Sequence, residues 1–140
     1  MSTIVTRAGK GSPLTHVEVD ANFTNLNTDK VGYIVGEGGT VAQSTSKSTA
    51  VTLNKKSGQI TMNGAALAAA TTVTFALTNS TIAATDLLVL NHVSGGTAGS
   101  YLLNAQAAAG SASINVRNIT AGSLSEAIVI GFAVAKASIT

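Results

Sequence analysis

Between residues 51 and 136, apolar side chains recur at every second position over several short stretches. The pattern is present at Val51–Leu53, Ile60–Met62 and Val73–Leu77, where Thr fills most of the positions in between. Because successive side chains of a strand point to opposite faces, this spacing is typical of strands with one face buried and the other in water. The alternation therefore predicts short β-strands rather than helices in this part of the chain.

The same reasoning predicts further strands at residues 86–92, 101–106, 112–118 and 126–136, separated by Gly, Asn and Ser turn signals. Seven or eight strands over about 100 residues is the size of a β-sandwich. We therefore expect a mainly β fold, an antiparallel β-sandwich. The alanine-rich stretch Ala65–Ala70 is too short to hold as a helix unaided, and we expect a single turn or a loop there.

Residues 14–30 carry the signals of a helix start. Thr15 is a favourable N-cap, and Glu18, three residues later, completes a capping box. Leu14 and Val19 occupy the positions of a hydrophobic staple around that cap. We predict one short α-helix in this segment.

The apolar face of this helix is narrow. Val19, Phe23 and Leu26 follow helical spacing, but asparagines surround them. A helix of about four turns with so little apolar surface is marginal in water, so it must lie against a partner. The residues before it, 1–12, are expected to form an extended arm with nothing of its own to pack on.

The helical pattern near the N-terminus and the alternating pattern after it divide the chain into two parts. Residues 1–37 form an N-terminal arm and helix, interpreted as an attachment segment, and residues 38–140 form the β-sandwich domain. Residues 31–43 are a glycine-rich connection, with room for a short strand at Tyr33–Val35.

The last predicted strand is apolar on both faces. One face carries Ile128, Ile130, Phe132 and Val134, and the other carries Ala127, Val129, Gly131, Ala133 and Ala135. The stretch Leu87–Leu90 has the same property. In a two-layer sandwich each strand has one face toward solvent, so such strands require a third layer. The simplest source of that layer is another copy of the chain, and we therefore expect a homo-oligomer.

The charge content fits a protein that assembles. Charged residues make up 10% of the chain, whereas a typical soluble domain has about a quarter. A neutral surface repels neighbouring copies weakly. The basic residues are scattered, and only Lys55 and Lys56 are adjacent, so we expect no nucleic-acid partner. The most apolar segment, residues 127–137, is shorter than a bilayer span, and the N-terminus lacks a signal peptide, so we expect no membrane partner and synthesis in the cytoplasm.

Few residues could support catalysis. Asp86, His92 and Ser94 come from one short stretch, whereas hydrolase triads converge from different elements on an oxyanion hole. Asp86 and Glu126 could be read as a glycosidase pair, but they are more simply partners of Arg117 or Lys136. The chain has no cysteine and no cluster of metal ligands. We therefore predict no enzyme activity, no catalytic residues, no metal and no cofactor.

Three Asn-x-Ser/Thr triplets begin at Asn22, Asn79 and Asn118. As glycosylation acceptors they would matter only in a secretory pathway, to which no signal peptide leads.

Residues 6–30, with the sequence TRAGKGSPLTHVEVDANFTNLNTDK, closely resemble the N-terminal segment of many tailed-bacteriophage fibre and virion appendage proteins. The remainder resembles a β-domain found at the distal ends of phage tail fibres and as small stand-alone virion proteins. The stretches that carry this second resemblance include Gly38–Val41, Leu53–Lys55, Gly58–Asn63, Thr78–Ser80, Arg117–Ala127 and Phe132–Val134. Together the two regions cover nearly the whole chain.

The resemblance implies a trimeric component of the virion exterior without enzymatic activity, made in the host cytoplasm. A tail fibre usually has a long shaft, and here only the glycine-rich connection could supply one. A capsid decoration, or cement, protein is therefore the favoured reading, with the major capsid protein as partner. A short trimeric tail fibre bound to tail or baseplate proteins is the alternative. A third reading is binding of host-surface glycans by loops at residues 94–100 and 110–112.

The candidate site residues follow from these readings. We predict contact with the capsid or a sister subunit for Ile4, Val5, Val19, Phe23 and Leu26. We assign to the core or to the trimer interface Leu88, Ile128, Ile130, Phe132 and Val134.

Overall fold

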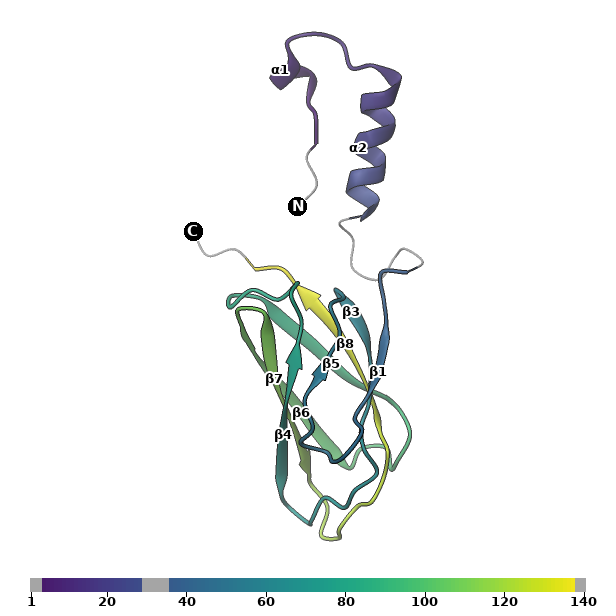
Figure 1. Cartoon of the computed structure of the whole chain (residues 1–140), viewed down its shortest axis with the longest axis vertical. Coiled ribbons are helices and arrows are strands. Elements are labelled where there is room, and N and C mark those ends of the chain that lie inside the picture. The colour runs from purple at the N-terminus through teal and green to yellow at the C-terminus, as the bar shows by residue number, and fades with distance from the viewer. Residues whose placement is uncertain (1–3, 29–35, 138–140) are drawn as a thin grey trace.

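A computed structural model describes residues 4–28 and 36–137 of the chain and is mainly β, as predicted, with 40% strand and 12% helix. The strands form two sheets of four that face each other as a sandwich (Figure 1). The first sheet has the order β1 (Thr40–Ala42), β3 (Ser57–Thr61), β8 (Val129–Ala135) and β5 (Leu87–Ser94). The second sheet has the order β2 (Val51–Thr52), β4 (Thr72–Thr78), β7 (Ser111–Asn118) and β6 (Tyr101–Ala108).

The prediction of an antiparallel sandwich is wrong at one edge of each sheet. The β1 and β3 strands pair in parallel, with Val41 opposite Ile60, and β2 and β4 also pair in parallel, with Val51 opposite Leu77. The cause is the path of the chain, which passes to the other sheet after every strand except β6. Each passage reverses the strand direction, so two passages return the chain to the first sheet in its original direction. Period-two alternation carries no information about this path.

The one hairpin within a sheet joins β6 to β7, which pair antiparallel from Tyr101–Asn118 to Ala108–Ser111. Gly110 in its turn has φ 75°, a conformation that residues with a Cβ rarely adopt. The predicted turn signal at this glycine is therefore matched by the backbone. Ala65–Ala70 is a loop, as predicted, pinned by an isolated bridge between Leu67 and Leu124.

Most predicted strands are present with slightly different bounds. The last strand begins at Val129 rather than near Glu126, although the Ile128 carbonyl already accepts a hydrogen bond from the Met62 N–H at 2.9 Å. Strand β1 is not among the predicted strands because its three residues are too few to show alternation. The strand expected at Tyr33–Val35 lies outside the described residues.

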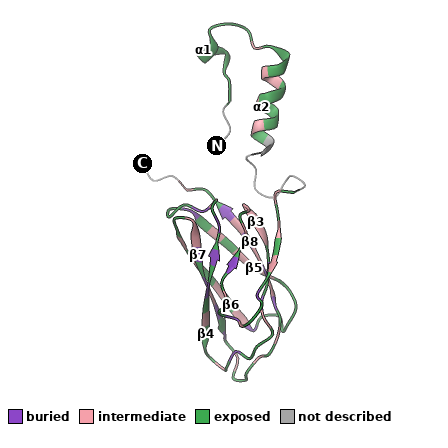
Figure 2. Ribbon diagram, viewed as in Figure 1, coloured by how far each residue is buried: buried purple, intermediate pink, exposed green. Residues whose placement is uncertain are grey.

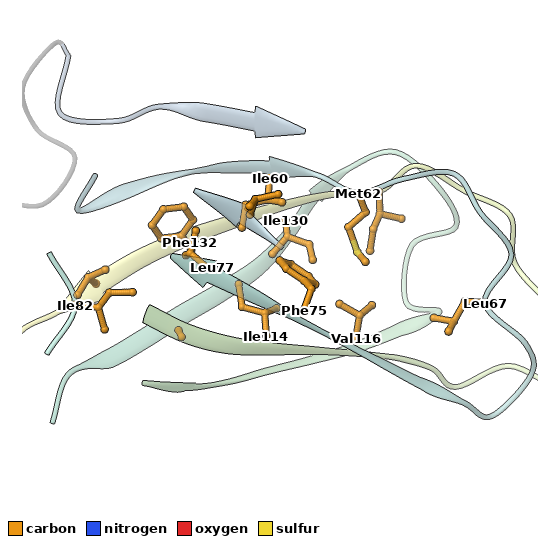
Figure 3. Packing of buried hydrophobic residues seen from close by; sticks show 14 residues of the cluster. Ile60, Met62, Leu67, Phe75, Leu77, Ile82, Ile114, Val116, Ile130 and Phe132 are labelled. Atoms are coloured by element: carbon orange, nitrogen blue, oxygen red, sulfur yellow. The ribbon is translucent and has the colours of Figure 1, made fainter. Parts of the chain in front are cut away.

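The core lies between the two sheets. Ile60 and Ile130 point inward from the first sheet, and Leu77 and Ile114 point inward from the second (Figure 3). All four are fully buried. Truncating such a side chain to Ala typically costs about 2–5 kcal/mol, so these positions account for much of the stability of the sandwich.

The N-terminal helical segment, residues 4–28, contains α1 (Arg7–Lys10) and α2 (His16–Thr28). The expectation of an extended arm over residues 1–12 is wrong at α1, because the Thr6 hydroxyl caps this turn by accepting a hydrogen bond from the Gly9 N–H at 3.1 Å. Figure 2 shows that the segment is mostly exposed, in contrast to the sandwich. Neither helix is long and apolar enough to cross a bilayer, a finding that covers the described residues alone.

Candidate interaction surfaces

The predicted capping box of α2 is present. The Glu18 N–H donates to the Thr15 hydroxyl at 3.3 Å, and the Thr15 N–H donates to the Glu18 carboxylate at 2.7 Å. Lys10 forms an ion pair with the same carboxylate at 2.5 Å. The Lys10 ammonium and the Thr15 N–H lower the pKa of Glu18 to about 2. The helix end predicted at Lys30 lies outside the described residues.

A pair of hydrogen bonds holds the arm against α2. The Asn22 side-chain oxygen accepts from the Val5 N–H, and its NH₂ group donates to the Val5 carbonyl, both at 2.8 Å. The amide of Asn22 thus satisfies both backbone groups of one extended residue, as a neighbouring strand would. This contact orders the segment with polar groups and provides little apolar burial.

The apolar side chains of the N-terminal helical segment are therefore left in solvent. Phe23 is 68% exposed and Leu26 is 57% exposed, and Ile4 and Val5 are also exposed. Val19 is half-buried. Neither α1 nor α2 packs against a described strand of the sandwich. The five residues predicted to contact the capsid or a sister subunit thus lie together on one small unit that covers none of them fully.

The second set of predicted residues lies in the core of the single chain. Ile128, Ile130, Phe132 and Val134 are buried, and Leu88 is half-buried and packs against the same cluster. These inward side chains are therefore not available to a second copy. The opposite faces of β8 and β5 form the outer surface of the first sheet, and it is this surface that a third layer would cover.

Large apolar side chains project from the outer surface at β5, an edge strand of the first sheet. Leu87 is 64% exposed, Val89 is 62% exposed and Val93 is 46% exposed. We refer to these three residues as the apolar ridge. Val93 shares this face because it continues the alternation of Leu87, Val89 and Asn91, and the pairing of β5 with β8 shifts only between His92 and Ser94.

A shallow hollow of about 710 Å³ lies beside the ridge. Gly131 on β8 is opposite Gln59 on one side and Asn91 on the other, and a Cβ on it would lie 2.8 Å from Val93 Cγ2, so Val93 covers part of its outer side. Ala133, the next outward residue on β8, contributes only a methyl group to the outer surface. The lining is completed by Val89 on β5, by the edge of Phe132, by Ser57 and Gly58 on β3, and by Gly36, Gly38, Gly39 and Thr40.

No charged residue occupies an outward position on a described strand of the first sheet, although the Lys55 ammonium donates to the Gly36 carbonyl beside the hollow at 2.7 Å. The outward positions of this sheet are Thr40, Ala42, Ser57, Gln59, Thr61, Leu87, Val89, Asn91, Val93, Val129, Gly131, Ala133 and Ala135. The outer surface of the second sheet is more polar. There the Thr74 hydroxyl donates to Asn115, and the Asn115 amide donates to Asn104 at 2.7 Å, a ladder across three strands.

A carboxylate secures the loop between β5 and β6. Glu126 accepts hydrogen bonds from the Thr97 N–H at 2.9 Å, the Thr97 hydroxyl at 2.6 Å and the Tyr101 hydroxyl at 2.7 Å. The Thr97 groups hold the pKa of Glu126 below its ordinary value, and burial together with Glu126 raises that of Tyr101. A Cβ on Gly96 would lie 2.6 Å from this carboxylate, so the glycine permits the close approach.

Lys47 is buried, and sequence reasoning assigned it no role. Its ammonium donates to the carbonyl oxygens of Asn63 at 2.6 Å and Glu126 at 2.5 Å, tying two loops together. Burial lowers the pKa of Lys47. A single lysine in a Ser/Thr-rich stretch offers no sequence signal for this contact, which joins segments 79 residues apart.

The residues considered for catalysis are not brought together. Asp86 directly precedes β5 and His92 lies near its far end, about 20 Å away at the usual rise of a strand. Asp86 is buried and pairs with Lys136 at 2.6 Å, one of the two partners predicted for it. His92 contacts the Gly95 carbonyl at 2.6 Å. Glu126 binds Thr97 and Tyr101 rather than Arg117 or Lys136.

Burial makes the carboxyl of Asp86 harder to ionise, but hydrogen bonds from the Ala83 N–H and from Lys136 outweigh this effect and lower its pKa. Asp86 is therefore an ionised structural anchor for the start of β5. Within residues 4–28 and 36–137, no three His, Asp or Glu side chains are close enough together to hold a metal ion.

The three Asn-x-Thr triplets have structural roles. Asn22 binds Val5, while Asn79 and Asn118 are fully buried at the ends of two strands. Asn79 bonds to Thr81, and Asn118 bonds to Thr120 in the same manner. These contacts occupy the side-chain amides that a glycosylation site would have to expose.

No model of a known protein family matches this chain, and neither the curated proteins nor the solved structures contain a significant match to it.

Proposed function

We propose that this chain is a non-enzymatic structural protein of the bacteriophage virion, a homotrimer that decorates and stabilises the outer surface of the capsid. The main observation that supports this proposal is that the chain has two separate apolar surfaces that its own fold leaves uncovered. One is the Phe23 and Leu26 face of α2, and the other is the outer surface of the first sheet. Such surfaces mark interaction sites when they exceed the scattered apolar groups of an ordinary monomer.

Two independent surfaces suit a protein that joins other proteins. One can bind copies of the chain, while the other binds a different partner. A trimer that contacts several capsid subunits at once gains by avidity, since all contacts must break together before the trimer leaves. In this proposal the N-terminal helical segment binds the capsid, and the sandwich forms the trimer.

The assignment to phage virions is supported by the resemblance of residues 6–30 to the N-terminal segments of phage fibre and appendage proteins. The titratable groups support a non-enzymatic role, because Asp86, Glu126 and Lys47 are each engaged in contacts that hold the sandwich together.

The same resemblance favours a second candidate, a short trimeric tail fibre or appendage that binds host glycans. The polar ladder of Thr74, Asn115 and Asn104 would then offer hydroxyl and amide groups to a sugar. The loop at residues 94–100 is less suited to this role than its sequence suggested, because Thr97 is bound by Glu126 and Ser100 is buried.

Copy number in intact particles distinguishes the candidates. Quantitative mass spectrometry of purified virions, with antibody labelling in electron micrographs, should find hundreds of copies on the head if the chain is a decoration protein. A few trimers at the tail would establish the appendage instead. Particles without the chain would overturn both.

A further inference from the structure

We propose that Asn63 is a self-modification site, at which the folded chain converts its own asparagine to isoaspartate without an enzyme. Asn63 lies between β3 and β4 and is followed by Gly64, the one Asn-Gly step in the sequence. The reaction consumes water and releases ammonia. It is independent of the proposed function, because every group that takes part belongs to a single copy of the chain.

The reaction passes through a cyclic imide. The Gly64 backbone nitrogen loses its proton to hydroxide and attacks the side-chain carbon Cγ of Asn63. A bond forms between this nitrogen and Cγ, the bond from Cγ to the amide nitrogen breaks, and the amide nitrogen takes up a proton from water and leaves as ammonia. Water then opens the imide. Opening at the former backbone carbonyl of Asn63 leaves the chain running through Cγ and creates a free carboxylate, which is isoaspartate.

The attacking nitrogen is accessible. Gly64 is exposed, and a Cβ built on it would meet nothing within 4 Å. Among the described residues, none accepts a hydrogen bond from the Gly64 N–H. The proton can therefore be removed by solvent without breaking a contact of the fold.

The Lys47 ammonium favours removal of that proton. It donates to the Asn63 backbone oxygen at 2.6 Å, and this oxygen belongs to the same peptide group as the Gly64 nitrogen. Once the N–H is lost, the oxygen carries much of the negative charge. A second hydrogen bond, to the Glu126 carbonyl at 2.5 Å, fixes the ammonium in place. Because Lys47 is only 4% exposed, water does little to screen its attraction for the charge.

The carbon that is attacked is activated as well. The Ala65 N–H donates to the Asn63 side-chain oxygen at 2.8 Å. Attack on Cγ places negative charge on this oxygen, so the hydrogen bond stabilises the intermediate in the way that an oxyanion hole does. The NH₂ group that leaves donates to the Ser44 carbonyl at 3.1 Å, a contact on the surface of the protein.

Asn79 and Asn118 make the same turn without the reactive nitrogen. Each accepts at its side-chain oxygen from the N–H two residues later, as Asn63 does. The N–H directly after Asn79 donates to the Asn54 side chain at 2.9 Å, and the one directly after Asn118 donates to the Ser100 carbonyl at 3.0 Å. Both asparagines are also fully buried. The turn alone is therefore insufficient, and these two residues serve as comparators within the same molecule.

Lys47 also selects the product. Its ammonium polarises the imide carbonyl that derives from the Asn63 backbone, so water attacks this carbonyl in preference to the one at Cγ. The carboxylate that forms then lies beside the ammonium, and a hydrogen bond to a neutral oxygen becomes an ion pair. We therefore expect isoaspartate rather than aspartate as the main product.

Ageing of the unaltered, folded protein at neutral pH tests the inference. Peptide mapping by mass spectrometry measures conversion at Asn63, and electron-transfer fragmentation distinguishes isoaspartate from aspartate. The same chain unfolded in guanidinium chloride gives the rate of the sequence without the Lys47 and Ala65 contacts. The folded chain should convert Asn63 about tenfold faster than the unfolded chain, a modest share of what a donor at a developing charge can contribute. Asn79 and Asn118 should stay unmodified in the folded chain. A folded rate equal to or below the unfolded rate would overturn the inference.

Two variants test the parts of the site. Gly64→Ala has room for its methyl group, so the fold should be kept, and conversion should slow because the methyl group hinders attack by the nitrogen. Lys47→Met should slow conversion and also lower the ratio of isoaspartate to aspartate, a ratio that loss of stability alone does not change. Arg117→Met, which removes an exposed cation from the second sheet, is the control and should behave like the unaltered chain. Circular dichroism checks that each variant is folded. An unchanged rate in Gly64→Ala, or an unchanged rate and product ratio in folded Lys47→Met, would refute the site.

Discussion

Asn79 and Asn118 are fully buried and make equivalent turns, each accepting two hydrogen bonds from the threonine two residues later. The Asn118 oxygen accepts from the Thr120 N–H at 2.9 Å and from its hydroxyl at 2.7 Å, and Asn79 does the same with Thr81 at 2.9 and 2.8 Å. The amide NH₂ groups bind carbonyl oxygens of distant loops. The two asparagines thus end β4 and β7 and fasten the next loop to the sandwich.

Asn118→Ala should destabilise the sandwich strongly. The substitution removes the donor that serves the Leu67 and Gly122 carbonyls at 3.0 and 2.7 Å, and unsatisfied buried groups cost about 1–3 kcal/mol each. We expect a loss of roughly 2–4 kcal/mol in urea denaturation. Asn104→Ala, at an exposed site in the polar ladder, is the control, and a similar loss in that variant would contradict the role assigned to burial.

The carboxyl of Glu18 should titrate near pH 2, as measured by NMR chemical shifts. Its pKa is lowered from 4.5 to about 2 by Lys10 and the Thr15 N–H, so the capping box contributes fully above pH 4.5. That contribution is lost as the pH falls from 4.5 through 2, because the folded segment must then take up a proton it disfavours. Lys10→Ala should return the pKa toward 4.5, and an unchanged value would show that the ion pair is not the cause.

Lys47→Met should lower the free energy of unfolding although it increases the apolar content of the chain. The methionine cannot donate to the Asn63 and Glu126 carbonyls, which would be left without the lysine's hydrogen bonds. We expect a loss of about 1–3 kcal/mol in thermal or urea unfolding. Arg117→Met removes a cation from an exposed site on the second sheet and should change stability little. Equal effects would mean that the loss of positive charge, not the contact, matters.

Phe23→Ala should weaken binding to phage particles and leave the sandwich folded. The side chain is exposed on the stripe of α2, and α2 does not pack against a described strand. Co-sedimentation with particles measures attachment, and circular dichroism measures the β-structure. Val17→Ala is the matched control, because Val17 is 77% exposed but points away from the stripe at helical spacing. Loss of β-structure in Phe23→Ala would instead make α2 part of the folded core.

Local signals in the sequence predicted the elements well. Thr15 and Glu18 were sufficient to place the start of α2, because a capping box is made by residues three apart. Alternation placed β4, β6 and β7 and separated the inward face of β8 from its outward face. The thin stripe at Phe23 and Leu26 predicted that α2 needs a partner, and both side chains are exposed in the single chain.

Contacts between distant residues were beyond such reasoning. The position of Val93 over Gly131, the pairing of Gly131 with Gln59 and Asn91, and the carbonyl partners of Lys47 all depend on which strands become neighbours. The parallel pairing of β1 with β3 also depends on which strands become neighbours. The order of strands in a sheet is a property of the whole chain rather than of any stretch of residues.

By itself, then, the sequence determined which segments become strands and helix, and that some apolar surface would stay uncovered, because period and capping are set by near neighbours. The tertiary structure alone decided where that surface lies. Packing Ile60, Ile130, Leu77 and Ile114 into one core uses one face of each strand, and the strand order then sets which remaining side chains meet on the outside.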